Sequence, residues 1–122
     1  MSPAVFAAAA LACGAGAVVR FLLTRINGTW KLPWPTLIAN AAGSLVLGAI
    51  AQVALNEPDA NTLMLIVGGG FAGGLTTFSS LAVDAVVLWR SGRPAYAGGY
   101  LGVTFVVGLA GAALGWAIAS GL

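Results

Sequence analysis

The stretch GGGFAGGLTTFSS, residues 68–80, decides how this chain folds. It lies inside an apolar run from Thr62 to Trp89, which is longer than the about 20 residues that one membrane crossing needs. Glycine pairs followed by paired threonines in the middle of a span predict a broken helix. Carbonyls freed by such a break are tolerated in a membrane only where an ion or a cavity satisfies them, and backbone oxygens suit a hard cation. Phe78 lies just beyond the break, and the edge of its ring carries partial positive charge that can face a small anion.

The same stretch contains the pattern GxGxxG, formed by Gly68, Gly70 and Gly73. In dinucleotide-binding folds this pattern follows a strand, opens a helix and precedes an acidic residue by about 20 positions. Here it lies inside an apolar span, and Asp84 comes too early. We therefore exclude a dinucleotide site.

The chain as a whole has the composition of a membrane protein. Of its 122 residues, 60% are hydrophobic and 7% are charged, against about 25% charged residues in soluble domains. Histidine is absent and Cys13 is the single cysteine, which excludes disulfides, histidine-based zinc sites and Ser/His or Cys/His catalysis. We therefore do not expect this protein to be an enzyme. The net charge of +2 implies no nucleic-acid partner.

The apolar stretches predict an all-α integral membrane protein in which residues 1–122 form a single domain of four spans. We place these spans at about 3–24, 34–55, 62–89 and 95–120. Trp30, Trp34 and Trp89 fall at the expected span ends, where indole rings anchor among lipid headgroups. A cleaved signal peptide is the alternative for the first span, but no Lys or Arg precedes that stretch and no soluble domain follows it.

Polar side chains inside the spans are functional candidates, because burying them in lipid is costly. Arg20, Asn40, Asp84 and Tyr100 each lie about five or six residues from a basic loop, roughly 8–9 Å along a helix, so we expect them in one layer. Arg20 and Asp84 could then neutralise each other; alternatively, Arg20 extends to the interface and Asp84 is merely its counter-ion. We expect Asn40 to face a ligand or to bridge two helices.

The fourth span carries a polar stripe at four-residue spacing, formed by Tyr96, Tyr100, Thr104 and Gly108. Residues at this spacing share one helical face. The stripe could guide an anion along the span. A helix-packing seam is an equally good interpretation, because Gly and Thr are common in such seams.

The sequence resembles the Fluc/CrcB fluoride channel family over essentially its whole length. Four elements carry the resemblance: GAVVR at 16–20, NAAGS at 40–44, GFAGGLTTFSS at 70–80 and GRPAYAGGY at 92–100. Any one of them would be weak alone. Their order and their depths in a chain of this size make the signature specific.

The resemblance implies an antiparallel, dual-topology dimer with separate fluoride pores and a structural sodium ion, not transported, on the central axis. Gly73 and Thr76 would supply the backbone carbonyls for that sodium ion. The residues that match the family's pore are Asn40, Thr77, Phe78, Ser80, Tyr100 and Thr104. Arg20 and Asp84 match structural or vestibule positions.

Two positions depart from the family's pattern. Leu81 stands in the pore where a second phenylalanine is usual, and Gly108 stands where a serine would be expected. These departures bear on whether both pores conduct.

The implied activity is passive, selective export of fluoride from the cytoplasm, which reduces fluoride toxicity. The implied location is a bacterial-type inner (plasma) membrane, crossed several times. The partners are then fluoride, membrane lipid and a second subunit, either identical or a sister chain.

The loop charges bear on the choice between these subunits. Arg25, Lys31, Arg90 and Arg93 all fall in the 25–33 and 90–94 loops, whereas the 56–61 loop and the termini hold no Lys or Arg. We therefore expect the two basic loops in the cytoplasm. So strong a bias disfavours insertion in both orientations and, together with Leu81, favours a sister chain.

Three other functions fit the sequence less well. A small multidrug-resistance transporter has a similar length but uses a membrane-embedded Glu in its first span, and this chain has no acidic residue before Glu57. A noncatalytic scaffold subunit would leave the broken span and Asn40 unexplained. An intramembrane enzyme would have no credible base beyond Asp84.

Overall fold

The computed structural model describes residues 2–26 and 32–121, and in these ranges the chain is entirely helical apart from turns. Four helical stretches are long and apolar enough to cross a membrane, and the third of them is broken. The expectation of a four-span, all-α protein with a broken third span is therefore confirmed. The elements are α1 (Pro3–Thr24), α2 (Trp34–Ala54), α3 (Ala60–Leu63), η1 (Met64–Ala72), α4 (Gly73–Leu75), α5 (Ser79–Arg90) and α6 (Pro94–Ser120).

Local signals explain where the long helices begin. α1, α2 and α6 each have a proline in their first two positions, where the missing N–H costs no hydrogen bond. The Ser2 side chain also accepts a hydrogen bond from the Val5 N–H at 3.3 Å, which caps α1. Gly92 has φ +78° in the turn between α5 and α6, a conformation that favours glycine.

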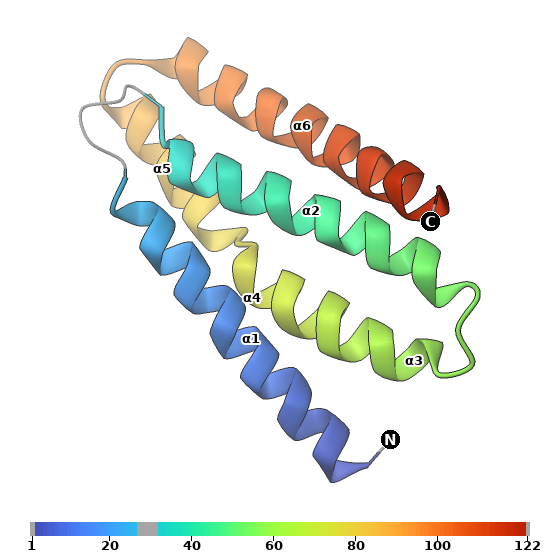
Figure 1. Cartoon of the computed structure of the whole chain (residues 1–122). Helices are drawn as coiled ribbons and strands as arrows, with labels where there is room; N and C mark the ends of the chain where they lie inside the picture. Colours follow the sequence, from blue (N-terminus) through green and yellow to red (C-terminus); the bar gives the residue numbers. More distant parts are fainter. Residues whose placement is uncertain (1, 27–31, 122) are drawn as a thin grey trace.

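The third span consists of α3, η1, α4 and α5. α2 lies between α6 and the first part of this span, α3 to α4 (Figure 1), whereas α5 packs directly against α6. α1 packs on the other side of the third span, mainly against η1 and α4. Glycines permit these close approaches. A Cβ on Gly74 would collide with the backbone of Cys13 in α1, and one on Gly115 would collide with the backbone of Leu45 in α2.

The third span departs from ordinary helical geometry before it breaks. η1 is a π-helix of nine residues, which includes the three successive glycines Gly68, Gly69 and Gly70. π-Helical turns are rare and are often found at functional sites. No pattern in the sequence predicted this π-helical segment.

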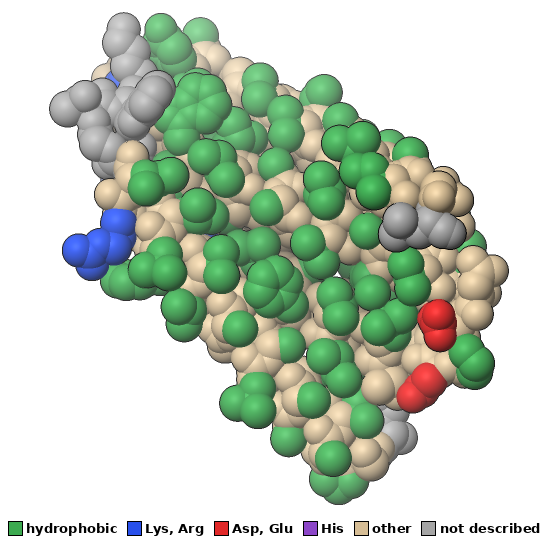
Figure 2. All heavy atoms as spheres, viewed as in Figure 1, with side chains coloured by type: hydrophobic (Ala, Val, Ile, Leu, Met, Phe, Trp, Pro, Cys, Tyr) green, Lys and Arg blue, Asp and Glu red, His purple; other side chains and the backbone are tan. Residues whose placement is uncertain are grey.

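Charged side chains gather at opposite ends of the bundle (Figure 2). Arg25 follows α1, Arg90 is the last residue of α5 and Arg93 comes just before α6. Glu57 and Asp59 lie between α2 and α3, at the end that also holds both termini (Figure 1). The expected headgroup anchor Trp30 and the loop residue Lys31 lie outside the described residues.

The tight glycine contact between α2 and α6 yields a matched pair of substitutions on α6. Gly115→Ala should destabilise the chain by about 1–3 kcal/mol, because its methyl group overpacks against the α2 backbone. Gly102→Ala should be neutral or stabilising, because its added Cβ would meet no other element of the described structure within 4 Å and alanine favours helix. Thermal unfolding in detergent measures both changes, and an equal loss in the two variants would refute this packing.

Candidate functional site: the break in the third span

The break spans Thr76 to Phe78, between α4 and α5. The Thr76 N–H still makes a helical hydrogen bond to the Ala72 carbonyl at 3.0 Å, but the Thr76 backbone is extended, with φ −83° and ψ 158°. Helical bonding therefore stops at Thr76 and resumes in α5. The break contains no proline, and side chains from the neighbouring helices bind the backbone groups that it frees.

The side-chain amide of Asn40 on α2 binds both backbone groups of Thr77. Its Oδ1 accepts from the Thr77 N–H at 2.8 Å, and its Nδ2 donates to the Thr77 carbonyl at 3.1 Å. In a continuous helix the Thr77 N–H would bond to the Gly73 carbonyl. Asn40 thus replaces that bond and holds the break open, as a residue that bridges two helices.

Two further contacts stabilise the edges of the break. The Thr77 hydroxyl accepts from the Ser80 N–H at 3.1 Å, which satisfies one of the free donors in the first turn of α5. On the other side, Arg20 Nε donates to the Gly74 carbonyl at 3.2 Å, which ties α1 to α4. Thr77, Ser80 and Arg20 are therefore all part of the architecture of the break.

The expected pairing of Arg20 with Asp84 is wrong. Asp84 Oδ2 instead accepts two hydrogen bonds from hydroxyls, one from Thr36 at 2.8 Å and one from Tyr100 at 3.1 Å. Arg20 instead donates to the carbonyl of Gly74, which precedes Asp84 by ten residues and lies on the other side of the break. The freed carbonyl at the break offers Arg20 a partner that the sequence did not reveal.

The expected single layer of polar residues is also wrong. Arg20 and Asn40 contact the break, whereas Asp84 and Tyr100 meet at Thr36, which precedes Asn40 by about one turn, or roughly 6 Å. Counting residues from a loop measures distance along one helix. That distance equals depth only when all the helices are parallel and begin at the same level.

Thr36 is the polar residue that the sequence analysis missed. It lies four residues before Asn40, on the same face of α2. The spacing of Thr36, Asn40 and Ser44 along α2 was the signal that could have identified it.

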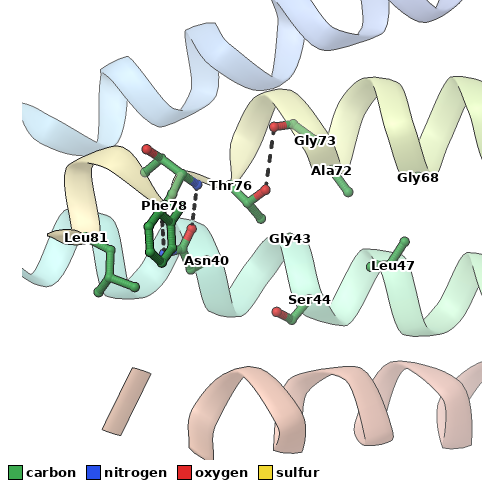
Figure 3. A pocket seen from close by; sticks show the side chains of 11 residues that line it. Asn40, Gly43, Ser44, Leu47, Gly68, Ala72, Gly73, Thr76, Phe78 and Leu81 are labelled. Atoms are coloured by element: carbon green, nitrogen blue, oxygen red, sulfur yellow. Dashed lines mark hydrogen bonds between the residues drawn. The ribbon is translucent and has the colours of Figure 1, made fainter. Parts of the chain in front are cut away.

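A cavity of about 390 Å³ opens at the break (Figure 3). None of the described residues that line it is charged. They are Asn40, Gly43, Ser44, Leu47, Gly68, Ala72, Gly73, Thr76, Thr77, Phe78 and Leu81. Phe78 and Leu81 both line this cavity and also a second one of about 320 Å³, as their three-residue spacing predicts. The Phe78 side chain is 81% exposed within the single chain.

The polar stripe on α6 is only partly buried. Tyr100 and Thr104 are buried, whereas Tyr96 is exposed, and Gly108 faces Ser44 on α2. Thr104 Oγ1 is enclosed without a hydrogen-bond partner among the described residues.

The fold and the site together define a class of protein. A four-span membrane protein whose third helix is broken beside an uncharged cavity with polar groups has the construction of a channel or transporter subunit.

The chain belongs to the CrcB family: the profile described as "CrcB-like protein, Camphor Resistance (CrcB)" matches residues 7–116. A relative named fluoride-specific ion channel FluC 1, from Streptococcus pneumoniae serotype 4, is 40% identical over 106 residues, which cover 87% of this chain and 92% of the relative. FluC 2 of Cutibacterium acnes is 43% identical over 115 residues, 90% of this chain and 93% of the relative. FluC of Bordetella petrii is 36% identical over 121 residues, 98% and 94% of the two chains.

These comparisons confirm the resemblance noted in the sequence. The relatives are named as ion channels, not enzymes, in agreement with the expectation from composition. With its four spans, the chain is a multi-pass protein of the bacterial-type plasma membrane.

The Asn40 contacts predict a specific loss of stability. Asn40→Leu should lower the free energy of unfolding by about 2–6 kcal/mol, because it leaves both backbone groups of Thr77 unsatisfied at about 1–3 kcal/mol each. Gln52→Leu is the control on the same helix, since the Gln52 side chain makes no hydrogen bond within the described ranges and should cost little. Unfolding in mixed micelles measures both, and similar losses in the two variants would contradict the role of Asn40.

Proposed function

We propose that this chain forms a fluoride-specific channel through which fluoride leaves the cytoplasm by passive electrodiffusion, which reduces fluoride toxicity. Family membership and the names of the relatives support the proposal. The structural observation that carries it is the uncharged cavity at the break, where Asn40, Thr77 and Phe78 meet. A membrane potential negative inside assists export by about 2.3 kcal/mol per charge per 100 mV.

The groups at the cavity suit an anion that must be dehydrated but not trapped. Asn40 Nδ2 carries two N–H groups, and only one is used by the Thr77 carbonyl, so the other is free to donate to an anion. The ring of Phe78 offers its positive edge. Conduction requires binding that is weak enough to allow exit, and such partial charges meet this need better than a fixed cation. Arg20 does not line the cavity but stabilises the break by donating to the Gly74 carbonyl.

Asp84 orients the hydroxyls on the cytoplasmic side of the break. By accepting from Thr36 and Tyr100, it fixes the proton of each hydroxyl and leaves their oxygen lone pairs to face elsewhere. Tyr100 and Thr104 then extend the polar path along α6, away from the basic loops. This is the arrangement that we propose for the approach to the cavity.

A structural sodium ion fits the donors left free by the break. The Gly73 carbonyl has lost the Thr77 N–H to Asn40 and retains only a long contact of 3.5 Å from the Thr76 hydroxyl. Gly73 and Thr76 both line the open cavity (Figure 3). Carbonyl oxygens are the ligands that a hard cation prefers. We propose that these two carbonyls, with those of a second subunit, hold sodium and fix the two broken spans together.

A second subunit is also needed to cover Phe78 and to close the open cavity. We propose an antiparallel dimer, in which each exposed break meets the other. The partner is either a second copy of this chain or a sister chain, and the loop charges and Leu81 favour the sister chain.

Fluoride efflux from liposomes containing the purified chain tests the channel function, with chloride efflux as the measure of selectivity. Phe78→Ile should slow fluoride efflux by up to about tenfold, the effect expected from losing one aromatic-edge contact. Leu81→Phe should preserve or raise the rate. Phe71→Ile is the control in the same span, because Phe71 does not line the cavity. Normal, selective conduction by Phe78→Ile would exclude the aromatic role, and an assembled dimer, of this chain alone or with its sister chain, that conducts no fluoride would refute the function.

The sodium proposal predicts an ion-specific stability. The unfolding temperature of the detergent-solubilised protein should fall when sodium is replaced by potassium or N-methylglucamine at constant ionic strength, because a bound ion stabilises only the folded assembly. Identical unfolding temperatures in all three salts would contradict a sodium site.

The partner proposal is tested by orientation. With a tag on the C-terminus and the chain expressed alone, the positive-inside rule predicts that most molecules place their termini outside. If equal populations face both sides and fluoride efflux is full, no sister subunit is needed.

A further inference from the structure

α2 and α6 run in the same direction and pack in a fixed register. A Cβ on Gly108 would lie 3.5 Å from Ser44 Oγ, and one on Gly111 would lie 3.1 Å from the Ala41 carbonyl oxygen. Two turns before the contact between Ser44 and Gly108, the two helices meet again, because Thr36 and Tyr100 donate to the same oxygen of Asp84. Residues on the two helices are therefore paired at successive turns.

This register defines three polar levels, each about 6 Å from the next. The first holds Thr36 and Tyr100, the second holds Asn40 and Thr104, and the third holds Ser44 and Gly108. On α6 the series of hydroxyls ends at Thr104, because Gly108 has no side chain. On α2 it continues, because Ser44 carries a hydroxyl at that level.

The Ser44 hydroxyl is available for a ligand. Ser44 lies on the side of α2 that faces α6 (Figure 3) and lines the same cavity as Asn40 and Phe78. A serine inside a helix commonly donates to a carbonyl one turn earlier, but the Ser44 hydroxyl makes no hydrogen bond to any described residue. It is a donor in a cavity where no acceptor among the described residues uses it.

Thr104, one turn earlier on α6, shows the same lack of a partner. Its side chain is only 8% exposed, and Oγ1 is enclosed without a hydrogen bond to the residues that the structure describes. Buried polar groups are costly when nothing satisfies them. Two adjacent levels therefore hold free hydroxyls that point to a bound ligand, and the small, strongly hydrogen-bonding fluoride ion fits such donors.

We propose that Ser44 is a fluoride ligand, and that its hydroxyl supplies from α2 the donor that α6 lacks at Gly108. This inference rests on the proposed channel function and extends the path one level beyond Thr104, toward the end of the bundle that holds Glu57 and Asp59. The role of Ser44 depends on the residue at position 108 of α6, because a hydroxyl on either helix at this level should be able to donate to fluoride.

Fluoride efflux from liposomes containing the full chain tests this exchange of hydroxyls. Ser44→Ala should slow efflux by about tenfold, the loss expected for one hydrogen bond to an anion. Adding Gly108→Ser to that variant should restore most of the rate, since it returns a hydroxyl from the facing helix. Adding Gly108→Ala instead should not, because it returns only a methyl group. A wild-type rate for Ser44→Ala, or equal rescue by serine and alanine at 108, would overturn the proposal.

Fluoride binding in detergent separates this inference from the channel function. If the assembled wild-type dimer conducts no fluoride, the channel function fails, and the role of Ser44 is then decided by the rise in unfolding temperature that sodium fluoride causes relative to sodium chloride. A rise in the wild type that is lost in Ser44→Ala and recovered with Gly108→Ser supports the ligand. A rise that is equal in wild type and Ser44→Ala, or absent from both, overturns it.

Discussion

The structure depends on one side-chain amide that takes over the hydrogen bonds of one backbone residue. Asn40 accepts from the Thr77 N–H and donates to its carbonyl, so the third span is broken without any backbone group of Thr77 being left unpaired. A membrane interior tolerates irregular backbone only under this condition. The extended conformation of Thr76, the free carbonyl of Gly73 and the cavity beside Phe78 all lie next to this contact.

The charged residues within the spans act at a distance from the cavity. Arg20 holds a carbonyl that the break has released, and Asp84 orders two hydroxyls about one turn away. The cavity itself is lined by neutral groups. This separation suits a pathway for fluoride, because a full charge beside the ion would either repel it or bind it too tightly to release. Partial charges on amide, hydroxyl and phenyl groups can replace water without trapping the anion.

The amino-acid sequence was enough to predict the spans and the break, because apolar length and the Gly-Gly/Thr-Thr pattern are local signals. It could not determine how side chains on different helices combine. Asn40 was expected to bridge helices or to face a ligand, and only the structure identified Thr77 as its partner. The pairing of Arg20 with Asp84 was wrong because residue counts along a helix give neither its rotation nor its tilt.

The sequence could not predict the contacts between α2 and α6 either, because it does not show how one helix is rotated relative to another. Thr36 and Ser44 lie one turn to either side of Asn40, but their significance appears only when Tyr100 and Gly108 are found opposite them. The π-helix of η1 had no signal except a run of glycines. The interhelical contacts and the π-helix depend on tertiary packing. The local periodicity of a single sequence does not reveal that packing.

The central claim is that Asn40 replaces the helical hydrogen bond of Thr77 when the chain is in a membrane. Magic-angle-spinning NMR of the protein in lipid bilayers tests it through the dipolar coupling between the Thr77 backbone nitrogen and the Asn40 side-chain carbonyl carbon. The structure, with 2.8 Å between the Thr77 nitrogen and Asn40 Oδ1, places the side-chain carbon one C=O bond further away and predicts a measurable through-space coupling. A negligible coupling, together with helical chemical shifts through Thr76 and Thr77, would contradict the account.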